Sequence, residues 1–432
     1  TYFDYSLSEV VYAQNTSPNR SQFNNQNALN TFGTLEAIDN WAFVDFNGSI
    51  SQQAVSAFGT QSIDNTAINA NRTEVANYRL SPYLRGRVGD MASYEARYSR
   101  SVTSSDAAAG FGVTAADRTV KVSGDTAFRN LGWSADLSRQ SVDYSTGRPT
   151  EVDRGSLGLS YTITPQLNVF VNAGREANNY TSRDKQSSGT SGFGGNWSPS
   201  EMTRLSASSN RRSFGDAHSL SFEHRTARTA WKFSDSRDVS VTPSQTGLAS
   251  RGSIYDILYS QFASLEPDPV ARAQLVNAFL RSNGISPNAV VVSSFLTSAV
   301  SLQRRQDLSF ALLGVRDTVT FVATRSEGSR LDTVSTGVDD FNTSSLIRQR
   351  GLSVNYTHRL TPEYSLGVLV SQQKISGESS AQDTTMRFFN VNVTGRVGKQ
   401  ATVSVGVRHI VSSSSTAPYS ETAVIGNLTV WF

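Results

Sequence analysis

The sequence contains no cysteine among its 432 residues. This absence excludes disulfide frameworks, thiolate metal sites and cysteine nucleophiles, and it suits a protein that passes through an oxidising compartment. Long hydrophobic runs are missing as well, because no stretch approaches the roughly 20 apolar residues that a membrane-spanning helix requires. The hydrophobic fraction of 38% agrees with this. We therefore exclude a helical membrane topology.

Charge is scarce too, and the net charge of +3 is too small for a chain of this size to indicate nucleic-acid binding. The motifs HExxH, GxSxG, Walker A and the dinucleotide fingerprint are absent, and no carboxylate run has EF-hand spacing. The four histidines (His218, His224, His358 and His409) are scattered. We expect no enzymatic activity, no cofactor, no metal and no nucleic-acid partner. The alternative, a Ser/His pair assembled across strands, is recognised only by its geometry.

An alternation of apolar and polar residues with a period of two recurs along the chain. In residues 156–163, for example, Leu157, Leu159, Tyr161 and Ile163 share one face, and serine, glycine and threonine occupy the other. Residues 166–173, 364–370 and 401–407 repeat the pattern, and residues 425–432 end on an aromatic residue, as terminal strands of outer-membrane barrels do. A strand needs only one apolar face to cross a bilayer, so the mean hydropathy of -0.33 fits this pattern.

The pattern predicts an all-β fold, a transmembrane antiparallel β-barrel of about 20 strands (range 18–22) that forms a single domain over residues 1–432. Tight turns alternate with longer loops rich in serine, glycine and asparagine, and in such barrels the short turns are periplasmic and the long loops external. The strands are predicted to begin near residues 2, 25, 41, 74, 93, 115, 131, 154, 166, 191, 202, 218, 229, 300, 317, 344, 363, 384, 401 and 420.

One segment, residues 241–298, has a helical period and predicts a helical hairpin inserted between barrel strands on the side of the long loops. Asp268 is the predicted N-cap of its second helix, Pro269 takes the first helical position, and residues 283–284 supply the C-cap. Three arrangements stay open for this insertion. It forms a rim on an external loop, a plug in the lumen, or a docking surface for a partner.

Several runs resemble outer-membrane proteins associated with the PEP-CTERM/exosortase system. These runs are GTLEAIDNWAFVD (33–45), ISQQAVSAFG (50–59), RLSPYLRGR (79–87), HRTARTAW (224–231), PDPVAR (267–272) and LQRRQDLSF (302–310). The resemblance extends over nearly the whole chain and includes no catalytic motif. It implies a porin-like barrel encoded with exopolysaccharide and protein-sorting machinery, and it implies no substrate.

Strand parity places a set of basic residues on the predicted inner face, opposite the apolar positions. The predicted lumen-facing residues that would set pore selectivity are Arg79, Arg85, Arg97, Arg204, Arg212, Arg225, Arg305, Arg396 and Arg408, with Lys232 beside them. The acids predicted on that face are fewer: Glu95, Asp136, Glu223 and Asp307. Surplus guanidinium charge in a narrow aqueous pore favours anionic solutes. The alternative is that these residues pair across the sheet and only solvate the lumen.

Aromatic residues fall on both predicted faces. Tyr83, Phe170, Phe388 and Trp431 are predicted on the inner face, where aromatic rings either stack on sugars or pack against inward loops. Trp133, Tyr161, Tyr356 and Tyr364 are predicted on the outer face, as interfacial girdles.

Taken together, the residues predict an outer-membrane channel of a Gram-negative bacterium, a porin-like passive pore for exopolysaccharide or other anionic solutes. The alternative is a non-conducting anchor or docking platform for surface polymers or partner proteins, closed by the insertion and the 53–72 loop. The expected partners are the lipid bilayer and lipopolysaccharide, with a glycan or small anionic solute as cargo. A second copy of the chain and a surface or periplasmic protein are further candidate partners.

Overall fold

The computed structural model describes residues 2–11, 23–61, 71–106, 111–128, 130–241, 295–332, 340–398, 401–414 and 418–430, with residues 259, 268, 271–273 and 276 between them. The strands are β1 (Tyr2–Val11), β2 (Phe23–Ile38), β3 (Ala42–Ala54), β4 (Arg72–Val88), β5 (Ala92–Ser105), β6 (Gly112–Asp125), β7 (Leu131–Tyr144), β8 (Thr150–Thr164), β9 (Leu167–Asn178), β10 (Gln186–Ser200), β11 (Thr203–Arg212), β12 (Gly215–Arg225), β13 (Thr229–Ser240), β14 (Ser301–Leu313), β15 (Asp317–Arg330), β16 (Leu346–Arg359), β17 (Tyr364–Ser376), β18 (Thr384–Val397), β19 (Ala401–Ser414) and β20 (Tyr419–Val430). Between them lie a one-turn helix, α3 (Asp340–Thr343), and a 3-10 turn, η2 (Ser380–Gln382). In the described ranges, no helix is long and apolar enough to cross a membrane.

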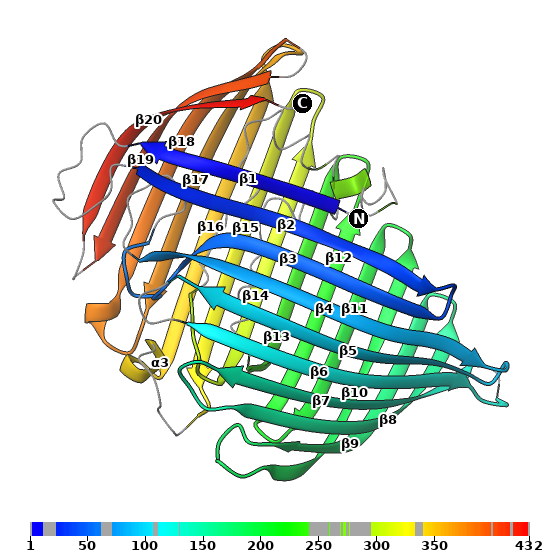
Figure 1. Ribbon diagram of the computed structural model, residues 1–432. Coiled ribbons are helices and arrows are strands. Elements are labelled where there is room, and N and C mark those ends of the chain that lie inside the picture. Colours follow the sequence, from blue (N-terminus) through cyan, green and yellow to red (C-terminus); the bar gives the residue numbers. More distant parts are fainter. Residues whose placement is uncertain are drawn as a thin grey trace.

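The strands form one antiparallel sheet in which each strand pairs with the strand before it and the strand after it in the chain. Figure 1 shows this sheet bending round on itself, so that β2–β9 cross in front of β11–β17. Over the residues that the structure describes, no pairing joins β20 to β1. The predicted all-β sheet of 20 strands is confirmed, whereas its closure into a barrel is not shown.

Every strand begins within five residues of its predicted start. The tight turns depend on residues that tolerate a left-handed backbone, namely Asn40 (φ 55°), Gly89 (φ 55°) and Gly398 (φ 69°). These turns all lie at one end of the sheet, which we call the turn end, and the longer loops lie at the other, the loop end. Both chain termini are at the turn end (Figure 1).

The two faces of the sheet are inverted relative to a water-soluble protein. In β16 the side chains of Gln349, Ser353 and Asn355 are buried, while those of Leu352 and Val354 on the opposite face are exposed. The same inversion recurs along the chain, with Leu157 69% exposed and Gln373 1% exposed. We call these the apolar face and the polar face. An apolar face that no protein covers is the face that lipid would cover.

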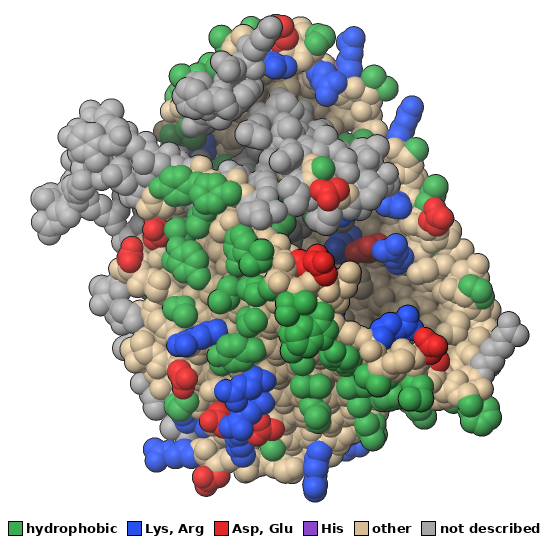
Figure 2. All heavy atoms as spheres, turned by 45° about the vertical axis from the view of Figure 1, so that its right-hand side comes forward, with side chains coloured by type: hydrophobic (Ala, Val, Ile, Leu, Met, Phe, Trp, Pro, Cys, Tyr) green, Lys and Arg blue, Asp and Glu red, His purple; other side chains and the backbone are tan. Residues whose placement is uncertain are grey.

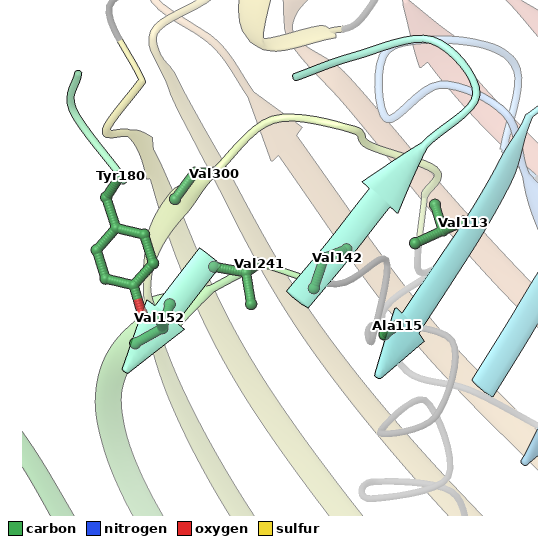
Figure 3. Close-up of a cluster of buried hydrophobic side chains, with 7 residues drawn as sticks. All are labelled: Val113, Ala115, Val142, Val152, Tyr180, Val241 and Val300. Carbon is green, nitrogen blue, oxygen red and sulfur yellow. The ribbon is translucent and has the colours of Figure 1, made fainter. Parts of the chain in front are cut away.

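The only sizeable apolar clusters among the described residues lie on the polar face near the loop end. One joins Val113 and Ala115 of β6, Val142 of β7 and Val152 of β8 to Tyr180, Val241 and Val300 (Figure 3). Since Val241 and Val300 flank the long segment between β13 and β14, residues from opposite parts of the chain meet on this face. The polar face is therefore the enclosed side of the curved sheet.

Most of the predicted insertion at 241–298 lies outside the described residues, and the structure shows no helical hairpin. Tyr259, residues 271–273 and Val276 are helical. The backbone N–H of Ala271 donates to the Asp268 carboxylate over 2.8 Å, and the Arg272 N–H donates to the Asp268 carbonyl over 2.9 Å. The predicted N-cap at Asp268 is thus confirmed. The predicted C-cap at 283–284 and the terminal pair Trp431 and Phe432 also lie outside the described residues.

Candidate functional site on the polar face

Strand pairing places the nine predicted arginines on the polar face, where they occupy three depths. Arg85, Arg204, Arg225 and Arg396 lie within three residues of the turn end of their strands. Arg79, Arg97, Arg305 and Arg408 lie near mid-height, and Arg212 ends β11 at the loop end. In Figure 2 the side of the molecule that carries the turns comes forward, and basic and acidic side chains lie in a hollow beside a wall of apolar side chains.

The mid-height arginines are mostly neutralised by carboxylates. Arg97 contacts Asp45 over 2.7 Å and Glu95 over 3.1 Å, and Arg305 contacts Asp307 over 2.8 Å. Arg408, which is 3% exposed, is ion-paired with Glu421. These ion pairs agree with the second interpretation of the sequence, in which arginines pair with acids of the sheet and leave the lumen without surplus positive charge.

Arg97 and Arg85 also flank a pair of aromatic rings. The guanidinium of Arg85 lies 4.2 Å from the Phe43 ring centroid, Phe43 stacks on Tyr83 with centroids 5.1 Å apart, and Arg97 lies 3.8 Å from the Tyr83 centroid. Such cation–π contacts are worth roughly 0.5–2 kcal/mol each. The Tyr83 ring is engaged by Phe43 and Arg97, so the suggestion that it stacks on sugars gives way to a packing role.

Two arginines at the turn end have fewer acidic partners than the arginines at mid-height. Among the described residues, Arg204 makes no ion pair, and Arg225 donates a hydrogen bond to the Glu201 carbonyl over 3.4 Å. Glu223, opposite Arg204 in the register, is already ion-paired with Lys232 over 3.1 Å. Arg204 and Arg225 are therefore basic residues at the turn end of the polar face with no carboxylate partner among the described residues.

At the loop end, a buried network surrounds Glu176, whose side chain is 1% exposed. Its carboxylate accepts from Arg212 Nε over 2.8 Å, Arg154 Nε over 3.2 Å and Asn178 Nδ2 over 2.8 Å. Arg154 also donates to the Tyr180 hydroxyl over 3.0 Å. Burial raises the pKa of this Tyr180 hydroxyl above its ordinary value, so it stays protonated at neutral pH.

The acids of the polar face are more numerous than alternation predicts. Strand pairing adds Glu36, Asp45, Asp117, Glu176, Asp238 and Glu421 to the four predicted ones. It also adds basic residues that sequence reasoning missed, Lys121 and Arg154 among them. The alternation of inner and outer positions continues to the ends of each strand, and applying it there would have identified these residues. Ion pairing therefore leaves less surplus guanidinium charge than the sequence suggests.

A polar wall free of such pairs runs along β7–β11. It lines a groove of about 430 Å³ with the carboxylate of Asp136 and with serine and asparagine side chains, including Ser156, Asn168, Asn172, Ser208 and Asn210. Phe170 is the one aromatic side chain in this lining. Of the other inner aromatics, Phe388 is buried against Met386 and Ile410, and Trp431 lies outside the described residues. Phe170 alone retains the setting in which a ring could stack on a solute.

A layer of segments crosses the loop end of the polar face. Residues 54–61 leave β3, Leu296 donates to the Ala54 carbonyl over 3.2 Å, and Tyr419 of β20 donates to the Gln61 carbonyl over 2.7 Å. Ala54, Ala57 and Phe295 pack with Phe341, Ile347 and Ile375 in one apolar cluster. We call residues 54–61, 295–300 and 340–343 the mouth layer. It joins the start, the middle and the end of the sheet.

Asp340 is the polar anchor of the mouth layer. Its carboxylate accepts from Ser56 Oγ over 2.7 Å and from the Ala57 N–H over 2.5 Å.

Asp340→Ala leaves the buried N–H of Ala57 without its partner, so we expect a loss of about 1–3 kcal/mol of local stability. Hydrogen exchange at residues 56–61 should rise, while exchange in β7–β9 stays unchanged. Unaltered exchange at 56–61 would contradict the anchoring role.

Comparison with known proteins gives a fold and no family. No family model matches the chain, and no curated protein matches it. The FrpB iron transporter from Neisseria meningitidis is similar with 10% sequence identity and a TM-score of 0.50, covering 99% of this chain and 76% of that chain. The siderophore receptor PirA from Pseudomonas aeruginosa (10% identity, TM-score 0.43, 98% and 72% covered) and the copper transporter OprC (12%, 0.40, 94% and 71%) are also similar. The likeness to FrpB shows a shared fold, which resembles that of outer-membrane β-barrels.

Proposed function

We propose that this chain is an outer-membrane channel whose polar face lines a water path for small anionic solutes. The observation that carries the proposal is the inversion of the sheet, with polar side chains on the enclosed side and apolar side chains exposed outside. Lipid replaces water around such an apolar face, and water remains on the polar side. The basic residues at the turn end then bias the path towards anions.

Exopolysaccharide or another glycan is the proposed larger cargo. The groove along β7–β11 supports this, because its serine hydroxyls and asparagine amides donate to and accept from sugar hydroxyls, and the Asp136 carboxylate accepts from them. Phe170 adds an apolar surface to the same groove. The association with a PEP-CTERM system remains a proposal that rests on the sequence resemblance.

The mouth layer favours a second candidate function, an anchor or docking platform that does not conduct. In this alternative the contacts of residues 54–61 with Asp340 and Tyr419 close the loop end to solutes. The two candidates differ in one property. A channel has a continuous water path along the polar face, whereas a platform has none.

The absence of cysteine allows a direct test by single-cysteine labelling. Ser208→Cys places a thiol on the polar face, and Ala207→Cys, one residue earlier on β11, places it on the apolar face. In a planar bilayer, a charged thiol reagent should reduce the current of the Ser208→Cys variant and leave that of the Ala207→Cys variant unchanged. Equal block of both variants would contradict the assignment of faces, and the absence of current in all variants would favour the platform.

A further inference from the structure

The apolar face carries a row of three cations directly opposite one another. Arg325 of β15 pairs in register with Arg350 of β16, and Arg350 pairs with Lys374 of β17. All three side chains are exposed, with Arg325 at 52% and Lys374 at 53%. Arg348, two residues from Arg350, and Arg387 of β18 are exposed on the same face. We call these five residues the outer basic row.

Two nearby carboxylates neutralise the five residues of the outer basic row only in part. Residues directly opposite on neighbouring strands have Cβ atoms about 4.5–5.5 Å apart, and like charges in that position repel. Glu327 lies 3.6 Å from Arg325 and 3.7 Å from Arg348, and Asp383 lies 3.9 Å from Lys374. Arg350 and Arg387 make no ion pair with any described residue. The sheet therefore holds a concentration of positive charge that an external anion would stabilise.

The position of the row identifies the kind of anion. On β16 the next exposed residues towards the turn end are Leu352 and Val354, and on β17 they are Gln372, opposite Leu352, and Val370, opposite Val354. The row thus lies at the loop-end border of the apolar face. A ligand that covers both surfaces has an anionic headgroup and acyl chains, as a lipid does.

We propose that the outer basic row binds the phosphate groups of lipopolysaccharide in the leaflet at the loop end. Guanidinium groups bind phosphate oxygens in pairs of parallel hydrogen bonds, and arginines in adjacent strands present several such donors to one headgroup. The acyl chains then lie along Leu352, Val354 and Val370. This assignment rests on the membrane placement in the proposed function.

The chain contains its own matched control on the opposite wall. Arg118 of β6 and Arg139 of β7 are also opposite one another on the apolar face, with Arg175 nearby on β9. There Glu151 and Asp153 each lie 3.5 Å from Arg139, and Lys185 binds the same two carboxylates over 2.6 and 2.7 Å. In this second group the central Arg139 has two carboxylate partners, whereas Arg350 at the centre of the outer basic row has none among the described residues, so the second group should bind an external phosphate less well.

The test measures lipopolysaccharide binding to the purified full chain in a non-ionic detergent. The variant R325Q/R350Q/K374Q should bind about a hundredfold more weakly, since each basic residue near an anionic surface contributes roughly a factor of several to the affinity. The control R118Q/R139Q/R175Q should change the affinity less than threefold. Inorganic phosphate at millimolar concentration should not displace the lipid, because it lacks the acyl chains.

Equal binding by the two triple variants, or equal affinity for dephosphorylated lipopolysaccharide, would overturn the assignment. Circular dichroism of both variants shows whether the strands are retained, and the single variant R350Q provides a milder change with an expected loss of several-fold. Flotation of the unmodified protein with phosphatidylglycerol vesicles separates the two proposals. Failure to float would refute the membrane placement, whereas flotation with equal binding by the two variants would refute only the lipid site.

Discussion

Glu176→Ala should lower the free energy of unfolding by about 3–5 kcal/mol, the typical result of removing one partner from a buried ion pair. Glu176 is 1% exposed, and the Arg212 side chain that it binds is 9% exposed. Without the carboxylate, the one carboxylate partner left to Arg212 among the described residues is Asp238, whose side chain is 58% exposed, and Arg154 loses its carboxylate acceptor. The uncompensated guanidinium charge at the loop end is the source of the loss.

Urea unfolding of the protein in detergent micelles, followed by tryptophan fluorescence, measures this effect. Glu151→Ala is the control, since Glu151 is 38% exposed and its pairs with Lys185 and Arg139 lie at the surface. Surface pairs contribute roughly 0–1 kcal/mol. Similar losses in the two variants would show that Glu176 is not the centre of a buried network.

Reversing the charge at the turn end should change the channel from anion-selective to cation-selective. In R204E/R225E/R396E, each reversal alters the energy of a monovalent ion about 10 Å away by roughly 0.8 kcal/mol in water before screening. Screening at 0.1 M salt reduces this about threefold. Because anions and cations respond in opposite directions, the three reversals together change the ratio by about 1.6 kcal/mol, and the anion-to-cation permeability ratio should fall by about fifteenfold.

Reversal potentials across a salt gradient measure this ratio. The control R118E/R175E/R211E makes the same change in net charge on the apolar face. If both triple variants shift the ratio equally, net charge rather than position on the polar face determines selectivity. A ratio that does not move in R204E/R225E/R396E would remove the turn-end arginines from the proposed selectivity.

Alternation of residue types was sufficient to predict the strands and the face to which each side chain belongs. In β16, for instance, the alternation of Ser353 and Asn355 with Leu352 and Val354 is visible in the sequence and recurs as alternating burial. The positions of turns followed from residues such as Asn40 and Gly89, whose backbones adopt positive φ. Local patterns suffice for these features because each depends on a few neighbouring residues.

Which charges remain free could not be predicted, because that depends on contacts between strands. Arg212 of β11 reaches Glu176 of β9 across β10, and Arg97 of β5 reaches Asp45 of β3 across β4. The odd or even position of a residue in its strand gives the face on which it lies, but it does not show which side chain two strands away it contacts. The mouth layer was equally hidden, since Ser56 and Asp340 are 284 residues apart in the sequence and meet only in the folded sheet.

The most direct test of the central claim is the current carried by the unmodified protein in a planar bilayer, with its reversal potential under a tenfold salt gradient. If the polar face lines a water path with basic residues at its turn end, we expect a steady current and a reversal potential whose sign indicates anion selectivity. If the bilayer contains the folded protein and carries no current, the proposed channel function is contradicted. A cation-selective current would contradict the role of Arg204, Arg225 and Arg396.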